Sequence, residues 1–308
     1  MGAGIRARCA TLALAVSTVV GGCLPGRIGA RLIFATEHHP VQADPALPYE
    51  KVSFAGEGEG IVLRGWLFRT LGARRGTILY LHGRNQNREA AIPVVSVLVR
   101  RGYDVLAYDS RAHGESTGEY STFGYYEKRD VSRAIDRLGG GEVIVIGHSL
   151  GAAVALQAAA EDQRIVGVIA ISSFTTVQQI VRDQVPGIVP TPWVRGTVRN
   201  AGAVARVDVD EVDTVRAAHR IHVPVLLLHG AEDSFASPAH SRRIDAALAG
   251  PHDLVLVTGA HHNDVLASPV AWSAISTWLD AHAPPDQDLR REALSSGAPR
   301  AGRVERVH

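Results

Sequence analysis

The sequence predicts an α/β fold with a mainly parallel, doubly wound sheet. Short apolar runs alternate with amphipathic segments along most of the chain, which is typical of β-α units joined by right-handed crossovers. A run of β-branched residues at 143–146 leads through Gly-His-Ser-Leu-Gly at 147–151 into an alanine-rich helical segment. The apolar share of 46% in 308 residues is sufficient for the core of one large domain.

The expected elements follow from the period of the apolar residues. Residues 51–54 and 61–68, separated by a glycine-rich turn, predict an antiparallel hairpin at the N-terminal end of the domain. The buried strands predicted after it are residues 76–81, 103–108, 142–146, 165–171, 223–228 and 253–257. The predicted helices are residues 91–101, 127–138, the segment after residue 149, 238–248 and 269–282.

Residues 174–219 interrupt this alternation between two core strands. They contain three prolines and apolar residues at helical spacing, which favours an inserted helical lid. The apolar residues of this segment predict a pocket for an acyl chain. They are Val177, Ile180, Val181, Ile188, Val189 and Trp193.

The first 23 residues have the pattern of a targeting segment. Arg6 and Arg8 precede an apolar stretch at residues 9–20 that is too short to favour a spanning helix. Residues 20–23, Val-Gly-Gly-Cys, resemble a bacterial lipobox, which implies that Cys23 is lipidated. The expectation is a membrane-anchored lipoprotein of the cell envelope, attached through its N-terminus. A cleaved secretion signal, giving a secreted or periplasmic protein, and an uncleaved anchor remain alternatives.

The remaining organisation follows from composition. Residues 24–49 predict a linker, 50–283 a single catalytic domain, and 284–308 a polar, disordered tail. A net charge of +1 favours neither nucleic acid nor an acidic partner, and a monomer is expected. Since Cys9 and Cys23 are the only cysteines, no disulfide is expected in the mature domain.

No metal and no cofactor are expected. The chain lacks the H-E-x-x-H and paired-cysteine spacings of zinc sites and a phosphate-binding glycine loop.

Ser149 is the predicted nucleophile because it stands in a turn between a buried strand and a helix. Glycines at 147 and 151 allow the sharp turn and close packing that expose a serine hydroxyl at the end of a sheet. The chain has a second Gly-x-Ser-x-Gly at Ser116. No helix follows that serine, so it is interpreted as a loop residue.

Two later loops supply the groups that activate a serine hydroxyl, namely a base and a carboxylate that orients it. A carboxylate follows the strand at 223–228, with Asp233 and Glu232 as candidates. An imidazole follows the strand at 253–257, with His262 and His261 as candidates. Loops at the carboxyl ends of parallel strands meet at one edge of a sheet, so these groups are expected near Ser149.

The chain order Ser, Asp, His resembles that of the α/β-hydrolase fold, and the resemblance covers roughly residues 50 to 283. The last loop resembles the Gly-x-x-His-Asn-Asp of esterase-like members, which implies that His262 is the base. The loop at 230–233 resembles Gly-x-x-Asp, which implies Asp233. The stretch 109–116 resembles the family's Asp-x-Arg-Gly-x-Gly-x-Ser loop, which implies a structural role for Ser116.

The same resemblance implies an oxyanion hole. His82-Gly83 resembles the family's oxyanion-loop dipeptide, so the backbone N–H groups of Arg84 and Leu150 are the expected donors. Asparagine is common where this chain has Arg84, and the sequence assigns no role to the arginine side chain.

The predicted function is hydrolysis of a carboxylic ester through an acyl-enzyme on Ser149. A serine peptidase of the same fold, aminopeptidase-like, is the alternative. A non-enzymatic binding module of the envelope is a third reading. A haloalkane dehalogenase is excluded because that chemistry needs a carboxylate nucleophile, and residue 149 is a serine.

Overall fold

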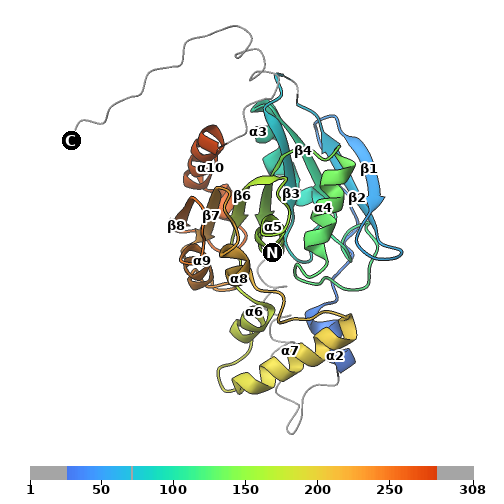
Figure 1. Cartoon of the computed structure of the whole chain (residues 1–308), viewed down its shortest axis with the longest axis vertical. Helices are drawn as coiled ribbons and strands as arrows, with labels where there is room; N and C mark the ends of the chain where they lie inside the picture. The colour runs from blue at the N-terminus through green and yellow to red at the C-terminus, as the bar shows by residue number, and fades with distance from the viewer. Residues whose placement is uncertain (1–25, 71, 283–308) are drawn as a thin grey trace, which may run out of the picture.

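The computed structural model describes residues 26–70 and 72–282. These residues form an eight-stranded sheet in the order β1-β2-β4-β3-β5-β6-β7-β8, with helices on both faces (Figure 1). The predicted signal segment and the predicted C-terminal tail lie outside the described residues. Within the described ranges, every helix is too short or too polar to cross a membrane.

The sheet begins with the predicted antiparallel hairpin. β1 (Glu50–Ala55) pairs with β2 (Val62–Phe68), and β2 pairs antiparallel with β4 (Tyr103–Tyr108). All further pairings are parallel. β4 pairs with β3 (Gly76–Leu81), which also pairs with β5 (Val143–His148). The sheet then continues through β6 (Ile165–Ile171), β7 (Val225–Gly230) and β8 (His252–Val257). The predicted fold class is therefore confirmed.

The central strands divide their side chains between two apolar cores. In β5, Val143 and Val145 face one core, while Ile144 and Ile146 face the other, as the two-residue period of a strand requires. The first core is covered by α4 (Glu127–Arg137), α5 (Leu150–Ala159) and α9 (Ala239–Asp245). The second is covered by α3 (Ile92–Arg100) and α10 (Pro269–His282). Short 3-10 helices lie at Arg88–Ala91 and Val265–Ala267.

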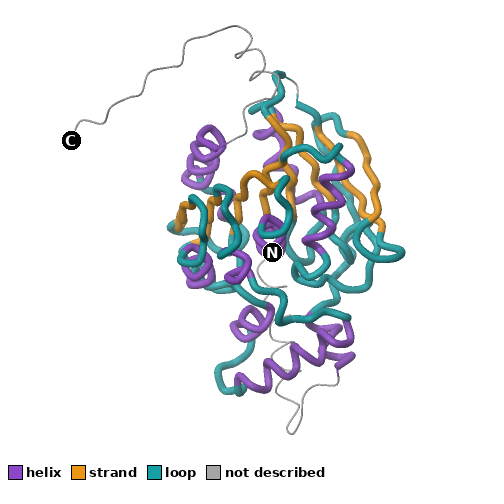
Figure 2. The backbone as a smooth tube through the Cα atoms, in the orientation of Figure 1, coloured by secondary structure: helices purple, strands orange, loops and turns teal. Residues whose placement is uncertain are grey.

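The predicted lid is an insertion of three helices after β6. These are α6 (Val177–Asp183), α7 (Thr191–Ala205) and α8 (Thr214–Ala218). An isolated bridge between Thr176 and Asp213 closes the base of the insertion. Beyond that bridge, α6 and α7 stand clear of the sheet, as the tube in Figure 2 shows. The helix α8 instead packs against α5 and α9 of the main body.

The segment predicted as a linker contains a helix, α2 (Gly26–Ile33), which packs against α7. A glycine allows the two helices to approach closely, since a Cβ at Gly29 would lie 3.2 Å from the Cβ of Ala201. Ala30, Ile33 and the following Phe34 are buried in the first core. Eight residues with two glycines have little helix propensity alone, so contact with α7 stabilises this helix. That contact is not visible in the local sequence.

Candidate active site

The turn between β5 and α5 places Ser149 at the end of the sheet. Ser149 has φ 52° and ψ −110°, a backbone conformation that costs energy for a residue with a side chain. Its backbone N–H donates a hydrogen bond of 2.8 Å to the carbonyl of Ile171 on the neighbouring strand. The strain is thus held by the two strands on which the turn rests.

Two glycines make this turn possible. A Cβ at Gly147 would lie 2.2 Å from the backbone oxygen of Gly151. A Cβ at Gly151 would lie 2.2 Å from the backbone oxygen of Leu81 on β3. Both contacts are with backbone atoms, which cannot rotate away as a flexible side chain would. The residues around Ser149 are therefore packed at a distance that only glycine allows.

We expect Gly151→Ala to destabilise the fold by about 3 kcal/mol or more, because the β3 backbone must move to admit the methyl group. Thermal unfolding followed by circular dichroism measures the effect. Gly141→Ala is the matched control, since a Cβ there meets no atom within 4 Å. Equal melting temperatures for the two variants would contradict the close packing described at the turn.

The structure brings the three predicted residues together. The Nε2 atom of His262 lies 2.9 Å from the Oγ of Ser149, and its Nδ1 atom lies 2.7 Å from the Oδ2 of Asp233. Ser149 and Asp233 are both buried. The imidazole therefore stands between hydroxyl and carboxylate at hydrogen-bonding distance from each, as transfer of the serine proton requires.

Four groups hold Asp233 as an ionised acceptor. The backbone N–H groups of Phe235 and Ala236 each donate to its Oδ1 at 2.9 Å. His229 and His262 both approach Oδ2, at 3.1 and 2.7 Å. Burial by itself raises the pKa of Asp233, but the hydrogen bonds from His229, His262 and the backbone outweigh it and hold this pKa well below its usual value.

His229 is a part of the site that sequence reasoning missed. It is fully buried at the end of β7, and its Nδ1 lies 2.6 Å from the hydroxyl of Ser241. If that hydroxyl donates, the proton of His229 resides on Nε2, which lies 2.8 Å from the carbonyl oxygen of Ala236 and 3.1 Å from the Oδ2 of Asp233. A histidine in an otherwise apolar strand end was the available signal, because a fully buried imidazole needs polar partners.

The two alternative residues point elsewhere. Glu232 and His261 are exposed, and the Nδ1 of His261 bonds to the backbone carbonyl of Glu232 at 2.8 Å. Ser116 is also separate from this site. It is buried, its hydroxyl donates to the carbonyl of Asp109 at 2.6 Å, and it accepts from the N–H of Arg64 at 2.9 Å.

The expected oxyanion donors stand at two chain segments. Leu150 is the first residue of α5, where backbone N–H groups have no acceptor within the helix and the helix dipole is positive. Arg84 follows β3, the strand next to β5. Gly83, the residue before Arg84, is held in a tight turn, because its N–H donates to the Oε1 of Gln86 at 2.9 Å.

Comparison with known proteins identifies this architecture. Residues 76–210 match the family model described as alpha/beta hydrolase fold. The solved esterase Pf2001 of Pyrococcus furiosus superposes with a TM-score of 0.65 at 23% identity, covering 81% of this chain and 99% of that one. The chain therefore has the α/β-hydrolase fold.

Two further proteins are similar to this chain. An uncharacterized protein of Mycobacterium tuberculosis is 28% identical over 259 residues, which cover 81% of this chain and 86% of the relative. The acylaminoacyl peptidase of Pyrococcus horikoshii has a TM-score of 0.60 at 12% identity. That match covers 79% of this chain but 43% of the peptidase.

The side chain of Arg84 links the loop after β3 to the helix α2. Its Nη2 donates to the carbonyls of Leu32, Ile33 and Ala35, at 3.5, 3.1 and 2.8 Å. These carbonyls lie at the C-terminal end of α2, where the helix dipole attracts a cation. Burial lowers the pKa of Arg84 to about 10, so the guanidinium remains charged at neutral pH.

The segment after α2 continues along the same loop. The N–H of Glu37 donates to the Oδ1 of Asn85 at 3.2 Å, and Asn87 donates to the carbonyl of His39 at 3.3 Å. The N–H of Ala43 donates to Glu89. The segment predicted as a linker therefore lies beside the loop after β3 and is hydrogen-bonded to it at several residues.

We expect Arg84→Met to lower kcat for an ester roughly ten- to a hundredfold with little change in KM, because a shift of the loop misplaces an oxyanion donor. Steady-state kinetics on folded protein measures this. Arg84→Lys should recover part of the loss, since an ammonium can still donate to a carbonyl. Arg100→Met, at an exposed arginine of α3, is the control. A lower melting temperature with unchanged kcat would show that Arg84 is only structural.

His148 holds the backbone of the predicted base. Its Nε2 lies 2.9 Å from the carbonyl oxygen of His262, an arrangement in which the imidazole donates. Burial, aided by the neighbouring His262, lowers the pKa of His148 to about 4. His148 is therefore neutral at pH 7.

This lowered pKa predicts acid sensitivity of the fold. Between pH 6.5 and 4 an unfolded histidine binds a proton that folded His148 does not, so the free energy of unfolding falls as pH falls through this window. The loss from this residue is of order 3 kcal/mol at most. Urea unfolding at pH 7 and pH 4.5 measures it. His148→Gln should show a smaller difference between the two pH values, and an identical difference would contradict the assignment.

The structure corrects the expectation that the apolar residues of the predicted lid all line a pocket for an acyl chain. Val177 and Ile180 are buried, but Ile188 and Trp193 are 89% and 53% exposed, so they do not line a pocket in this structure. An apolar side chain does lie beside the predicted base, since the ring centroid of Phe235 is 4.7 Å from that of His262.

Two further predictions concern a metal site and a lipidation site. In residues 26–70 and 72–282, no cluster of three or more His, Cys, Asp or Glu side chains could hold a metal ion. Cys23, the predicted lipidation site, lies outside the described residues.

Proposed function

We propose that this α/β-hydrolase cleaves carboxylic esters through an acyl-enzyme on Ser149. The observation that carries the proposal is the continuous contact from the Ser149 hydroxyl through His262 to Asp233, at 2.9 and 2.7 Å. The structural similarity to a Pyrococcus furiosus esterase supports the same class of reaction.

The reaction takes two steps. His262 accepts the hydroxyl proton as the Oγ of Ser149 attacks the ester carbonyl, and Asp233 stabilises the resulting imidazolium. The N–H groups of Leu150 and Arg84 bind the oxyanion, with each donor worth about 3 kcal/mol of barrier. The imidazolium then protonates the leaving alcohol. Water, deprotonated by His262, attacks the acyl-enzyme and releases the carboxylic acid and free Ser149.

A panel of substrates tests the proposal. The purified chain is assayed with p-nitrophenyl esters of graded acyl length, and with aminoacyl and acylaminoacyl p-nitroanilides alongside. Ester turnover well above amide turnover is the expected result. Preferential cleavage of the anilides would favour the peptidase, and no turnover of either class would favour the non-enzymatic binding module.

We also propose attachment to the cell envelope through the N-terminus, with lipid on Cys23. The support is the sequence at residues 9–23, an apolar stretch followed by Val-Gly-Gly-Cys. Mass spectrometry of the mature protein tests it. Acylated Cys23 at the N-terminus is expected, whereas an unmodified Cys23 would rule out the lipoprotein and leave a secreted form or an uncleaved anchor.

A further inference from the structure

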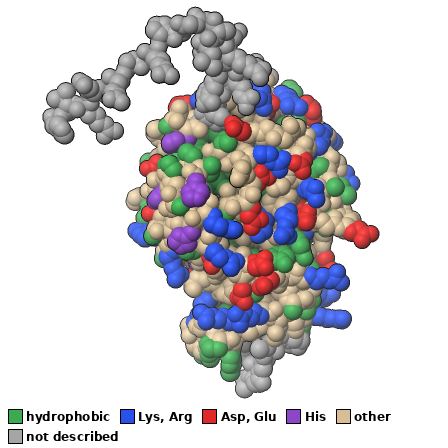
Figure 3. Space-filling model, in the orientation of Figure 1, with side chains coloured by type: hydrophobic (Ala, Val, Ile, Leu, Met, Phe, Trp, Pro, Cys, Tyr) green, Lys and Arg blue, Asp and Glu red, His purple; other side chains and the backbone are tan. Residues whose placement is uncertain are grey.

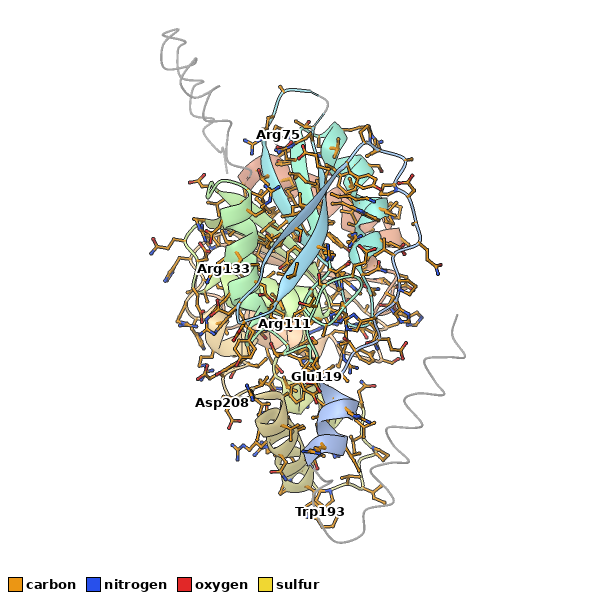
Figure 4. The ribbon with its side chains drawn as sticks, turned by 90° about the vertical axis from the view of Figure 1, so that its right-hand side faces the viewer. Arg75, Arg111, Glu119, Arg133, Trp193 and Asp208 are labelled. Carbon is orange, nitrogen blue, oxygen red and sulfur yellow. The ribbon has the colours of Figure 1, made fainter. Side chains whose placement is uncertain are left out.

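Exposed apolar side chains gather at one end of the molecule. Among the described residues, six large hydrophobic side chains are exposed. Four of them belong to α2, to α7 or to the loop between α6 and α7, namely Ile28, Ile188, Trp193 and Val204. This end lies opposite α10 in Figure 1, and Figure 4 places Trp193 at its tip.

The loop that carries Ile188 is held in place. Arg182 of α6 donates to the carbonyl of Val189 at 2.6 Å and to that of Gly187 at 3.1 Å. Prolines stand on both sides, at residues 186 and 190, and restrict the backbone further. Ile188 is thus 89% exposed on an ordered loop, so its exposure does not reflect a collapsed or frayed segment.

Trp193 continues a stripe of α7 that α2 only partly covers. Thr197 and Ala201 face Gly29, and Val204 faces Gly26, as the short distances from these glycines show. Trp193 lies one turn before Thr197 on the same side of the helix. Trp193 is 53% exposed.

The charged side chains of the two helices at this end, α2 and α7, are all positive. The arginines on α2 and α7 are Arg27, Arg31, Arg195 and Arg199, and neither helix contains an aspartate or glutamate. Arg199 is paired with Asp210 at 2.9 Å. Figure 3 shows Lys and Arg side chains in a band at this end of the molecule, with hydrophobic atoms beyond it. Apolar tips with arginines beside them are complementary to an anionic lipid surface.

The short connection between the apolar stretch and α2 determines which end of the domain would lie near a membrane. The apolar stretch at residues 9–20 precedes Gly26, the first residue of α2, by six residues. Six residues span at most about 20 Å when fully extended. A chain anchored through this stretch, or through lipid on Cys23, therefore holds the α2–α7 end at the bilayer.

We propose that the apolar tips Ile28, Ile188 and Trp193, together with Arg27, Arg31 and Arg195, form a docking face that rests on an anionic membrane surface. Gln184, four residues before Ile188, donates to the carbonyl of Phe235 at 2.6 Å, which connects the insertion to the loop beside His262. The inference rests on the proposed N-terminal attachment and is independent of the proposed esterase reaction.

The intrinsic fluorescence of Trp193 tests the docking face. Of the other tryptophans, Trp66 and Trp278 are buried, so the signal of Trp193 is obtained as the difference between the full chain and its Trp193→Phe variant. The chain carries Ser149→Ala throughout, so that enzymatic turnover cannot affect the result. It is mixed with vesicles of phosphatidylglycerol and phosphatidylcholine, with and without bromine on the acyl chains.

A blue shift of the Trp193 emission and its quenching by brominated lipid are expected. The quenching should fall with added salt and in pure phosphatidylcholine vesicles. Ile188→Ser should also reduce it. Val270→Ser is the matched control, because Val270 is 57% exposed on α10 at the opposite end.

Three results would overturn the proposal. Emission that stays unquenched while the chain floats with the vesicles would show attachment without docking of this face. A blue emission without vesicles, at every protein concentration, would show that a segment of the chain itself covers Trp193. A blue shift that grows with protein concentration in the absence of lipid would assign the face to a second copy.

Discussion

Replacement of Ser149 by alanine is expected to lower kcat for a soluble ester by about 10⁶-fold, because the nucleophile and the partner of His262 are lost together. The fold should remain intact, since alanine at this turn keeps the Cβ and removes one oxygen. Kinetics on the variant, with circular dichroism as the check of folding, measures the effect.

The chain offers its own matched control in the second Gly-x-Ser-x-Gly. Ser116→Ala removes a hydroxyl that bonds to Asp109 and Arg64, so it should reduce stability by about 1–3 kcal/mol. It should leave kcat nearly unchanged. Loss of turnover in Ser116→Ala, with turnover kept in Ser149→Ala, would reverse the assignment of the nucleophile.

Asp233→Asn is expected to lower kcat by about 10⁴-fold with little change in KM. The carboxylate accepts from Nδ1 of His262 and stabilises the imidazolium, whereas a neutral amide cannot balance that charge. An amide N–H turned toward Nδ1 would also favour the tautomer with its proton on Nε2, which cannot accept from Ser149. The pH–rate profile of the variant, followed with a soluble ester, measures the change.

Glu232→Gln is the control for the carboxylate. Its side chain is exposed and lies on the same loop, so this variant removes a neighbouring charge without touching His262. We expect turnover close to that of the unmodified chain. A larger loss in Glu232→Gln than in Asp233→Asn would contradict the role given to Asp233.

The elements nearest the site could be predicted from sequence because their signals are local. The β-branched run of β5, the glycines around Ser149 and the alanine-rich start of α5 lie within a few residues of one another. Because the predicted strands are parallel, the loops of Asp233 and His262 were expected at the same edge of the sheet. The choice between adjacent residues, such as His262 and His261, came from the resemblance and not from periodicity.

The contacts that sequence reasoning missed are formed between distant segments. The helix α2 is stabilised by α7, which lies more than 150 residues later in the chain. The Arg84 side chain binds carbonyls at the end of that helix, and backbone carbonyls leave no mark on residue type. The position of Ile188 also depends on the tertiary structure. Its apolar side chain suggested a pocket, but in the folded chain it is exposed to solvent.

Covalent labelling of the full chain with a fluorophosphonate measures the central feature most directly. A phosphonyl adduct on the tryptic peptide that contains Ser149 is expected, and it should be absent in His262→Gln, in which the hydroxyl loses its base. An adduct that instead forms at Ser116, or folded, unmodified protein that stays unlabelled at Ser149, would contradict a nucleophilic serine in this site.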